Sequence, residues 1–201
     1  MSHARAALVA VALGVLALSA CGDDAELTGL QREDPLDVGA VTLPEVDESG
    51  TATPFAMKAG DGELLIVYFG YTNCPDLCPT TLTDLRTAFE QMGDDADRIA
   101  VSMVTVDPER DTAAVLNRYL GGFVERYHAL RTEDPDELAA AEAAFLASSS
   151  VTKKPDGTVE VAHTANTYVV AADGTVVLEW PFGTPWRAMR TDLEQLLEDA
   201  A

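Results

Sequence analysis

The stretch from Leu64 to Leu85 constrains the fold of this chain most strongly, because it joins three structural signals in direct succession. Residues 64–69 (LLIVYF) form an unbroken apolar run, rich in branched and aromatic side chains, between Gly62 and Gly70. Such a run predicts a strand that is buried on both faces. Two cysteines follow in the next loop, and a helical pattern follows them. The sequence therefore predicts a central strand, a cysteine loop and a helix.

The helix after the cysteine loop has clear start and stop signals. We expect Cys78 to cap it and Pro79 to take its first helical position, where proline's missing N–H is harmless and its fixed φ is already helical. Leu82 and Leu85 recur on one face, and Gly93 ends the pattern. Unpaired N–H groups at a helix start favour thiolate and lower a cysteine pKa. The cysteine loop is thus typical of reactive or metal-binding thiols.

Strand and helix patterns alternate along the rest of the chain. Residues 98–106 predict a second interior strand, and Asp107, Pro108 and Asp111 predict the turn and cap of a helix over 112–120. The other expected elements are an N-terminal hairpin at 41–55, strands at 127–130, 158–161, 167–171 and 175–180, and helices at 135–147 and 185–197. This order predicts the α/β class, as a thioredoxin-like three-layer sandwich with an N-terminal hairpin and insertions.

The N-terminus resembles a bacterial lipoprotein signal. Arg5 precedes an apolar run, and the letters LSAC end that run at Cys21. The run is shorter than the about 20 apolar residues that a spanning helix needs, and a small residue precedes the cysteine. We expect residues 1–20 to be a cleaved signal peptide and Cys21 to be lipidated; the alternative is an uncut anchor with Cys21 idle. Either way, the folded part lies outside the cytoplasm, anchored to the cell membrane.

The rest of the chain is long enough for one domain. Residues 21–37 are polar, acidic and without hydrophobic periodicity, which predicts a flexible tether ahead of a folded domain over 38–201. The formal net charge of −21 disfavours nucleic acid and anionic lipid head groups as partners. Such acidity serves solubility, or else steers metal cations or a basic partner protein.

Cys74 and Cys78, which have three residues between them, are the thiols left after Cys21. A structural disulfide is the ordinary role of two close cysteines in a secreted protein. A bridge closing so small a loop stabilises weakly, however, because it removes little unfolded-state entropy. Thioredoxin-like oxidoreductases usually have two intervening residues, and the third gives the sulfurs more freedom to converge on one ion. Two thiolates suit Cu(I), whereas Cu(II) needs a third ligand.

Two histidines remain as candidates for that third ligand. His163 precedes an apolar strand, in a loop that could return to the cysteine loop at the edge of the sheet. Taken alone, a histidine in such a place is more often an ordinary surface or packed residue. His128, in RYHALR, has no comparable setting and is expected to be structural.

Three motifs, in order, resemble the SCO/SenC family of membrane-tethered copper proteins. They are YFGYTNCPDLCPTTL (68–82), VDPERDT (106–112) and His163 followed by Tyr168 and Val169. The resemblance covers about residues 38–197. It implies a thioredoxin fold that binds one copper, as Cu(I) or Cu(II). It also implies one of two tasks at the binuclear copper centre in subunit II of cytochrome c oxidase. The protein delivers copper to this centre, or it prepares the thiols of this centre.

The same resemblance assigns roles to individual residues. It implies that Cys74 and Cys78 are thiolate ligands of copper and that His163 is the imidazole ligand. Asp107 matches an aspartate that the family holds close to the copper loop, where it could hydrogen-bond and tune the site. Its other interpretation is a plain turn residue.

The sequence departs from the family pattern near these positions. Asn73 stands where many members have a histidine, and Ala162 precedes His163 where an aspartate is common. The anchor is a lipobox where many relatives use a transmembrane helix. These departures alter the polarity around the site and remove no expected ligand.

Two functions fit this pattern. The first is a copper metallochaperone and assembly factor without turnover, whose partner is cytochrome c oxidase subunit II or another copper or thiol protein. The second is a membrane-tethered thiol-disulfide reductase in which Cys74 and Cys78 form a redox-active catalytic pair. His163 separates the two, because an exchange enzyme needs no imidazole ligand. A peroxiredoxin-like peroxidase is a more distant third, since that chemistry uses a single activated cysteine in a different loop.

Overall fold

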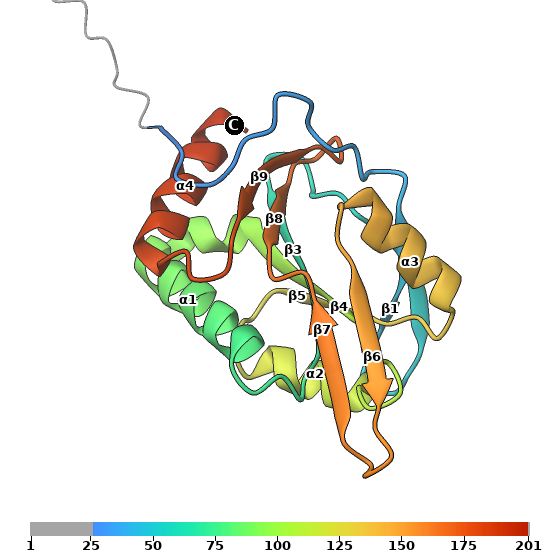
Figure 1. The fold of residues 1–201 in the computed structure, drawn as a ribbon. Coiled ribbons are helices and arrows are strands. Elements are labelled where there is room, and N and C mark those ends of the chain that lie inside the picture. The colour runs from blue at the N-terminus through green and yellow to red at the C-terminus, as the bar shows by residue number, and fades with distance from the viewer. Residues whose placement is uncertain (1–25, 201) are drawn as a thin grey trace, which may run out of the picture.

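A seven-stranded mixed sheet forms the centre of the computed structural model, which describes residues 26–200 (Figure 1). Its strand order is β2-β1-β5-β4-β3-β8-β9. In the middle, β3 (Leu64–Gly70) and β4 (Ile99–Thr105) run parallel, and every residue of both strands is buried. The central strand predicted from the apolar run is confirmed.

Both sides of this parallel core are extended. β5 (Tyr127–Leu130) pairs parallel to β4, and beyond it β1 (Thr42–Val46) and β2 (Ala52–Ala56) form the predicted N-terminal hairpin. On the other side, β8 (Thr167–Val170) pairs antiparallel with β3 and with β9 (Val176–Trp180). The predicted thioredoxin-like α/β architecture is confirmed.

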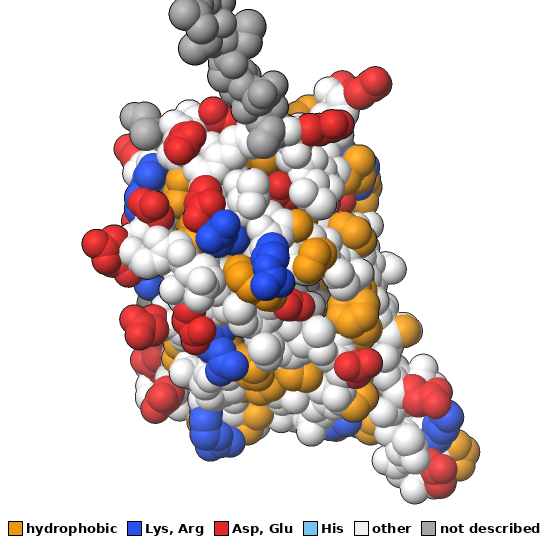
Figure 2. All heavy atoms as spheres, turned by 90° about the vertical axis from the view of Figure 1, so that its left-hand side faces the viewer, with side chains coloured by type: hydrophobic (Ala, Val, Ile, Leu, Met, Phe, Trp, Pro, Cys, Tyr) orange, Lys and Arg blue, Asp and Glu red, His pale blue; other side chains and the backbone are white. Residues whose placement is uncertain are grey.

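Helices cover both faces of the sheet. α1 (Leu77–Met92) and α4 (Trp186–Asp199) pack together on one side, and α3 (Pro135–Ala144) lies on the other (Figure 1). A short 3-10 helix, η1 (Gly93–Arg98), leads from α1 into β4. On the outer side of α1 and α4, acidic and basic side chains are mixed with apolar ones (Figure 2). This face therefore carries charge of both signs, although the chain as a whole is acidic.

Two helix starts differ from the expectation. α1 begins at Leu77 after Asp76, so Cys78 lies inside the first turn and does not cap the helix. α2 (Ala113–Gly121) is capped by Thr112, whose hydroxyl accepts the N–H of Val115, and Asp111 is free for another role. Both differences are shifts of one or two residues, which is the usual uncertainty of helix ends.

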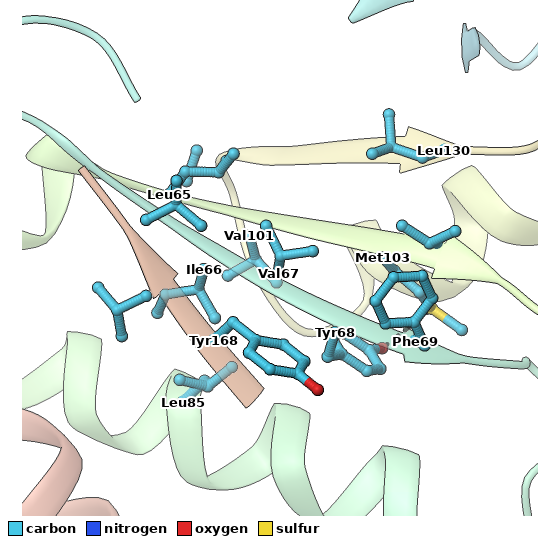
Figure 3. Packing of buried hydrophobic residues seen from close by; sticks show 14 of the residues in the cluster. Leu65, Ile66, Val67, Tyr68, Phe69, Leu85, Val101, Met103, Leu130 and Tyr168 are labelled. Atoms are coloured by element: carbon cyan, nitrogen blue, oxygen red, sulfur yellow. Dashed lines mark hydrogen bonds between the residues drawn. The ribbon is translucent and has the colours of Figure 1, made fainter. Parts of the chain in front are cut away.

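The hydrophobic core gathers along β3 and β4 (Figure 3). Phe69 and Tyr168 both pack edge-on against Phe145 at the end of α3, with ring centroids 5.5 and 5.1 Å apart. The hydroxyl of Tyr68 donates to the sulfur of Met103 at 2.9 Å. Because adjacent residues of a strand point to opposite faces, Tyr68 and Phe69 fix β3 from both sides. The strand that leads into the cysteine loop is thus rigidly held.

A separate two-stranded hairpin projects from the body of the domain (Figure 1). It consists of β6 (Ser149–Lys153) and β7 (Val159–His163), which pair antiparallel. The sequence predicts a strand only within β7, because β6 (SSVTK) is polar, is largely exposed and has no apolar run. His163 lies at the end of β7 and not in the predicted loop.

An N-terminal strap, residues 26–37, runs along β9. Its backbone forms two isolated bridges, one from Leu30 to Glu179 in β9 and one from Asp37 to Thr175 just before β9. Arg32 of the strap also forms a salt bridge with the buried carboxylate of Glu179. The sequence predicts a flexible tether as far as residue 37, whereas this part of it is docked. Pairing through backbone groups and a buried carboxylate leaves no periodic apolar pattern, which explains the difference.

Asp192 of α4 holds the same strap from the other side. Its carboxylate, in a residue that is 1% exposed, accepts the backbone N–H of Thr28 at 2.8 Å and of Gly29 at 3.2 Å. It also accepts the indole N–H of Trp180 at 2.8 Å. Three donors on two separate parts of the chain thus converge on one buried carboxylate.

The predicted signal peptide, residues 1–20, and the predicted lipidation site, Cys21, lie outside the described residues. Within residues 26–200, no helix has the length and apolar character needed to cross a membrane. The anchor therefore stays a prediction from the sequence.

Candidate metal centre

Two cysteines and one histidine converge where β3 ends. Cys74 lies in the loop after β3, Cys78 lies in the first turn of α1, and His163 lies at the end of β7. Their ligand atoms, two sulfurs and one ring nitrogen, all lie within 4.8 Å of one another. Both cysteines are free thiols. The structure thus brings together the three residues that the sequence indicates as ligands.

The imidazole of His163 is held in one tautomer. Its Nδ1 lies 2.9 Å from the carbonyl oxygen of Thr164, which can only accept, so Nδ1 carries the proton. Nε2 therefore presents a lone pair, and it lies 3.9 Å from the sulfur of Cys78. Tyr71 packs edge-on against the ring, with centroids 5.8 Å apart. A neutral imidazole oriented by its other nitrogen is the form that binds metals.

The two sulfurs have different surroundings. The sulfur of Cys74 accepts the backbone N–H of Cys78 at 3.4 Å, which is one of the unpaired donors at the start of α1. Cys78 is 2% exposed, and burial raises the pKa of its thiol well above the ordinary value, against the effect of a hydrogen bond to the Tyr71 backbone. The lowered pKa that the helix start predicts is therefore wrong for Cys78. Desolvation outweighs the helix dipole there.

Gly70 leaves no room for a side chain beneath this site. A Cβ at this position would lie 2.9 Å from the sulfur of Cys78 and 2.8 Å from the ring of Tyr68. The sulfur and the aromatic ring thus both lie close to the backbone of Gly70 at the end of β3. The glycine allows the strand backbone to pass directly beside the thiol.

Asp107 is connected to the site through two intermediate side chains. It is 2% exposed and forms a salt bridge with Arg110, while its backbone N–H donates to the hydroxyl of Thr105 at 3.1 Å. Burial raises the pKa of its carboxyl, and Arg110 acts in the opposite direction. The guanidinium of Arg110 lies over the ring of Tyr71, 5.7 Å from its centroid, and Tyr71 contacts His163. Sequence reasoning missed Arg110 and Tyr71, although both lie within the quoted motifs.

His128 lies in β5 of the main sheet. Its contacts there agree with the structural role expected from the sequence. Its Nδ1 is 2.8 Å from a carboxylate oxygen of Glu45, and its ring stacks on Phe55 with centroids 4.1 Å apart. These contacts join β5 to the N-terminal hairpin. His128 is therefore a suitable control for His163, because it lies outside the cysteine cluster.

The donor set fits a soft metal ion. Ligands that share one ion at bond lengths of about 2.0–2.3 Å lie roughly 3.5–4.5 Å from one another. The three donors here, all within 4.8 Å, are close to that spacing. Thiolate sulfur selects Cu(I), and the imidazole adds the nitrogen ligand that Cu(II) requires. Cys74, Cys78 and His163 could therefore hold copper in either oxidation state.

Binding of Cu(I) should strengthen as the pH rises. Because burial keeps the thiol pKa of Cys78 well above neutrality, the free protein carries this proton throughout the neutral range. The proton leaves when the sulfur becomes a ligand, so a higher pH favours the bound form by about tenfold per unit for each proton released. Chelator competition at several pH values, corrected for the chelator's own protonation, measures this slope. A flat profile would show that the Cys78 sulfur is not a ligand.

Comparison with known proteins gives one consistent family. The family model described as SCO1/SenC matches residues 46–198. An SCO2-like protein of Rickettsia prowazekii is 34% identical over 98 residues, which are 49% of this chain and 46% of that protein. The chain spans about two fifths to three fifths of the length of the first curated relatives it matches.

Two solved structures cover almost the whole of their own chains in the comparison. Bradyrhizobium japonicum ScoI with copper bound is 31% identical, with a TM-score of 0.64 over 77% of this chain and 96% of that one. BsSco, described as a member of the Sco family of cytochrome c oxidase assembly proteins, is 21% identical. Its TM-score is 0.59 over 83% of this chain and 98% of that one. At that identity BsSco shows the fold alone, and the fold agrees with the sheet and helices described above.

Proposed function

This chain belongs to the SCO1/SenC family, and from that membership we propose that it is a copper-binding assembly factor of cytochrome c oxidase. A relative in this family was solved with copper bound, and another is described as an oxidase assembly protein. We propose that one copper per chain is held by Cys74, Cys78 and His163. We further propose that this copper is cargo for the binuclear centre of oxidase subunit II, delivered without turnover.

One observation carries this proposal. Nε2 of His163 faces the cysteine pair, 3.9 Å from the sulfur of Cys78, and Nδ1 lies 2.9 Å from the carbonyl oxygen of Thr164, so the neutral ring presents its Nε2 lone pair to the sulfurs. Thiol-disulfide exchange needs no such imidazole, whereas Cu(II) binding does. The donor set therefore supports metal binding over simple exchange.

Each ligand contributes differently when the soft cation binds. Cys78 releases the proton that burial makes it retain, and its buried position shields the sulfur from water. The sulfur of Cys74 is already stabilised by the N–H of Cys78, so charge developing on it is met by a donor. His163 in its neutral form offers the lone pair of Nε2. The bound copper supplies the positive charge that offsets the two thiolates.

A thiol-disulfide reductase is the second candidate, favoured by two free thiols in one cluster at a helix start. In this function Cys74 and Cys78 would cycle between dithiol and disulfide. The thiolate is the attacking form, and the raised pKa of Cys78 makes that residue a poor nucleophile near neutral pH. Attack would fall to Cys74, which is 8% exposed.

We also propose that the domain works outside the cytoplasm, held at the cell membrane by lipid on Cys21 after removal of residues 1–20. The LSAC letters that end the apolar run support this proposal. An assembly factor in this position would meet its partner at the membrane surface.

A deletion strain separates the two candidate functions. If the protein supplies copper, added copper should restore cytochrome c oxidase activity, and a general thiol reductant should not. Oxidase activity in isolated membranes is the measurement, and a chain carrying both Cys74→Ala and Cys78→Ala, which should fail to complement, is the control. Rescue by the reductant alone would instead support the reductase.

A further inference from the structure

A fully buried carboxylate ties the cysteine loop to the segment before α2. Asp111 is 0% exposed, and its Oδ2 accepts the backbone N–H of Thr72 at 3.0 Å and the hydroxyl of Thr105 at 2.6 Å. Its Oδ1 accepts the hydroxyl of Thr72 at 2.6 Å. Thr72 belongs to the same loop as Cys74. The carboxylate therefore fixes the loop just ahead of the first cysteine.

The negative charge of Asp111 has no direct ionic partner among residues 26–200. All three of its donors are uncharged groups. Arg131 donates instead to the main-chain carbonyl of Asp111 at 2.9 Å and pairs with Glu133 at 2.7 Å. A backbone N–H and two hydroxyl groups are therefore the donors available to this carboxylate. Burying such a charge is unfavourable unless it is well bonded, and neither helix capping nor ion pairing accounts for it.

This charge acts on the interior beside the cysteines. Burial is the main cause of the raised pKa values of the Tyr68 and Tyr119 hydroxyls, Cys78 and Cys74 raise both further, and the negative charge of Asp111 adds the smallest increase. The ring of Tyr68 and the sulfur of Cys78 flank the same point at Gly70. Asp111 thus lies close to the interior beside the sulfur, and its two bonds to Thr72 tie it to the cysteine loop itself.

We propose that Asp111 is a positioning residue that holds the cysteine loop through Thr72 and that its negative charge shifts the site towards Cu(II) relative to Cu(I). This inference rests on the proposed copper site. Two thiolates and a neutral imidazole give a net charge of about −1 with Cu(I) and about 0 with Cu(II). A nearby carboxylate repels the first cluster and not the second.

Asp111→Asn tests the inference, because asparagine has the same shape without the charge. We expect the ratio of the Cu(I) and Cu(II) dissociation constants to move about tenfold in favour of Cu(I). Competition with chelators specific for each oxidation state, on the reduced protein, measures the two constants. Thermal unfolding of the metal-free protein gives the structural effect separately. Asp111→Ser is also uncharged and carries the same expectation if the asparagine variant does not fold.

Two control variants separate charge from structure. Thr105→Val removes the hydrogen bond to Asp111 and the one that the same hydroxyl accepts from the Asp107 N–H, and it keeps the carboxylate of Asp111, so it should lower the melting temperature and leave the ratio unchanged. Asp192→Asn neutralises another buried carboxylate with three donors, at the strap, and should behave likewise. Equal changes of both constants in Asp111→Asn would overturn this inference alone. A wild-type protein that binds neither ion would overturn the proposed function, and this inference with it.

Discussion

Replacing either Cys74 or Cys78 with alanine should abolish copper binding. Loss of an outer hydrogen-bond partner of a metal ligand alone lowers affinity by 10–100-fold, so removal of a thiolate ligand itself should lower the Cu(I) affinity by more than about a hundredfold. The stoichiometry of copper per chain after anaerobic loading and desalting should fall from one to a value near zero. Either variant leaves one sulfur and the imidazole of His163 in the cluster. One sulfur and one nitrogen cannot reproduce the soft two-sulfur site.

Thr80→Ala is a matched control for these variants. Thr80 is exposed on the same first part of α1, and its hydroxyl reaches only the neighbouring Asp76, at 3.5 Å. It should bind copper as the wild type does. Unchanged stoichiometry in both cysteine variants would show that the sulfurs are not the ligands.

His163→Ala should weaken Cu(II) binding selectively. Cu(II) needs the nitrogen ligand that Nε2 presents towards Cys78, whereas two thiolates alone still satisfy Cu(I) in a linear arrangement. We expect the Cu(II) affinity to fall by more than about a hundredfold and the Cu(I) affinity by less than about tenfold. The sulfur-to-Cu(II) charge-transfer absorption and the Cu(II) paramagnetic resonance spectrum report the first change. Chelator competition reports the second.

The chain offers its own control for the imidazole. His128→Ala removes a histidine that packs on Phe55 and bonds to Glu45 in the main sheet. This variant should lose some stability and keep both copper affinities. Equal loss of Cu(I) and Cu(II) in His163→Ala would assign that residue a role in folding the hairpin end and not in binding.

The parts of the fold that were predictable have a continuous or periodic apolar pattern. β3 is buried along its whole length, so its residues are visible in the sequence as one apolar run. β6 has a polar sequence and an exposed surface, and nothing in its letters distinguishes it from a loop. The strap is held by backbone groups, Glu179 and Asp192, none of which produces a hydrophobic period.

The residues of the site also differ in how far they could be predicted from the sequence. The cysteine pair at a helix start was readable from spacing, but His163 joined it only through the family resemblance, since strand pairing in the hairpin brings it back to the sulfurs. The contacts that link Asp107 to Arg110, and Arg110 to Tyr71, depend on three-dimensional packing and could not be predicted from the sequence. Asp111 lies in one of the quoted motifs, but its hydrogen bond to Thr72 could not be predicted without the fold.

The strap has one more consequence, for contacts between copies of the protein. β9 is an outer strand of the seven-stranded sheet, and such a strand offers unpaired N–H and C=O groups to any extended chain nearby. The strap already occupies part of that edge through its bridges. The opposite outer strand, β2, contains Pro54, which has no N–H to donate. The segment that resembles a simple linker therefore covers part of a sheet edge through which neighbouring molecules could otherwise pair.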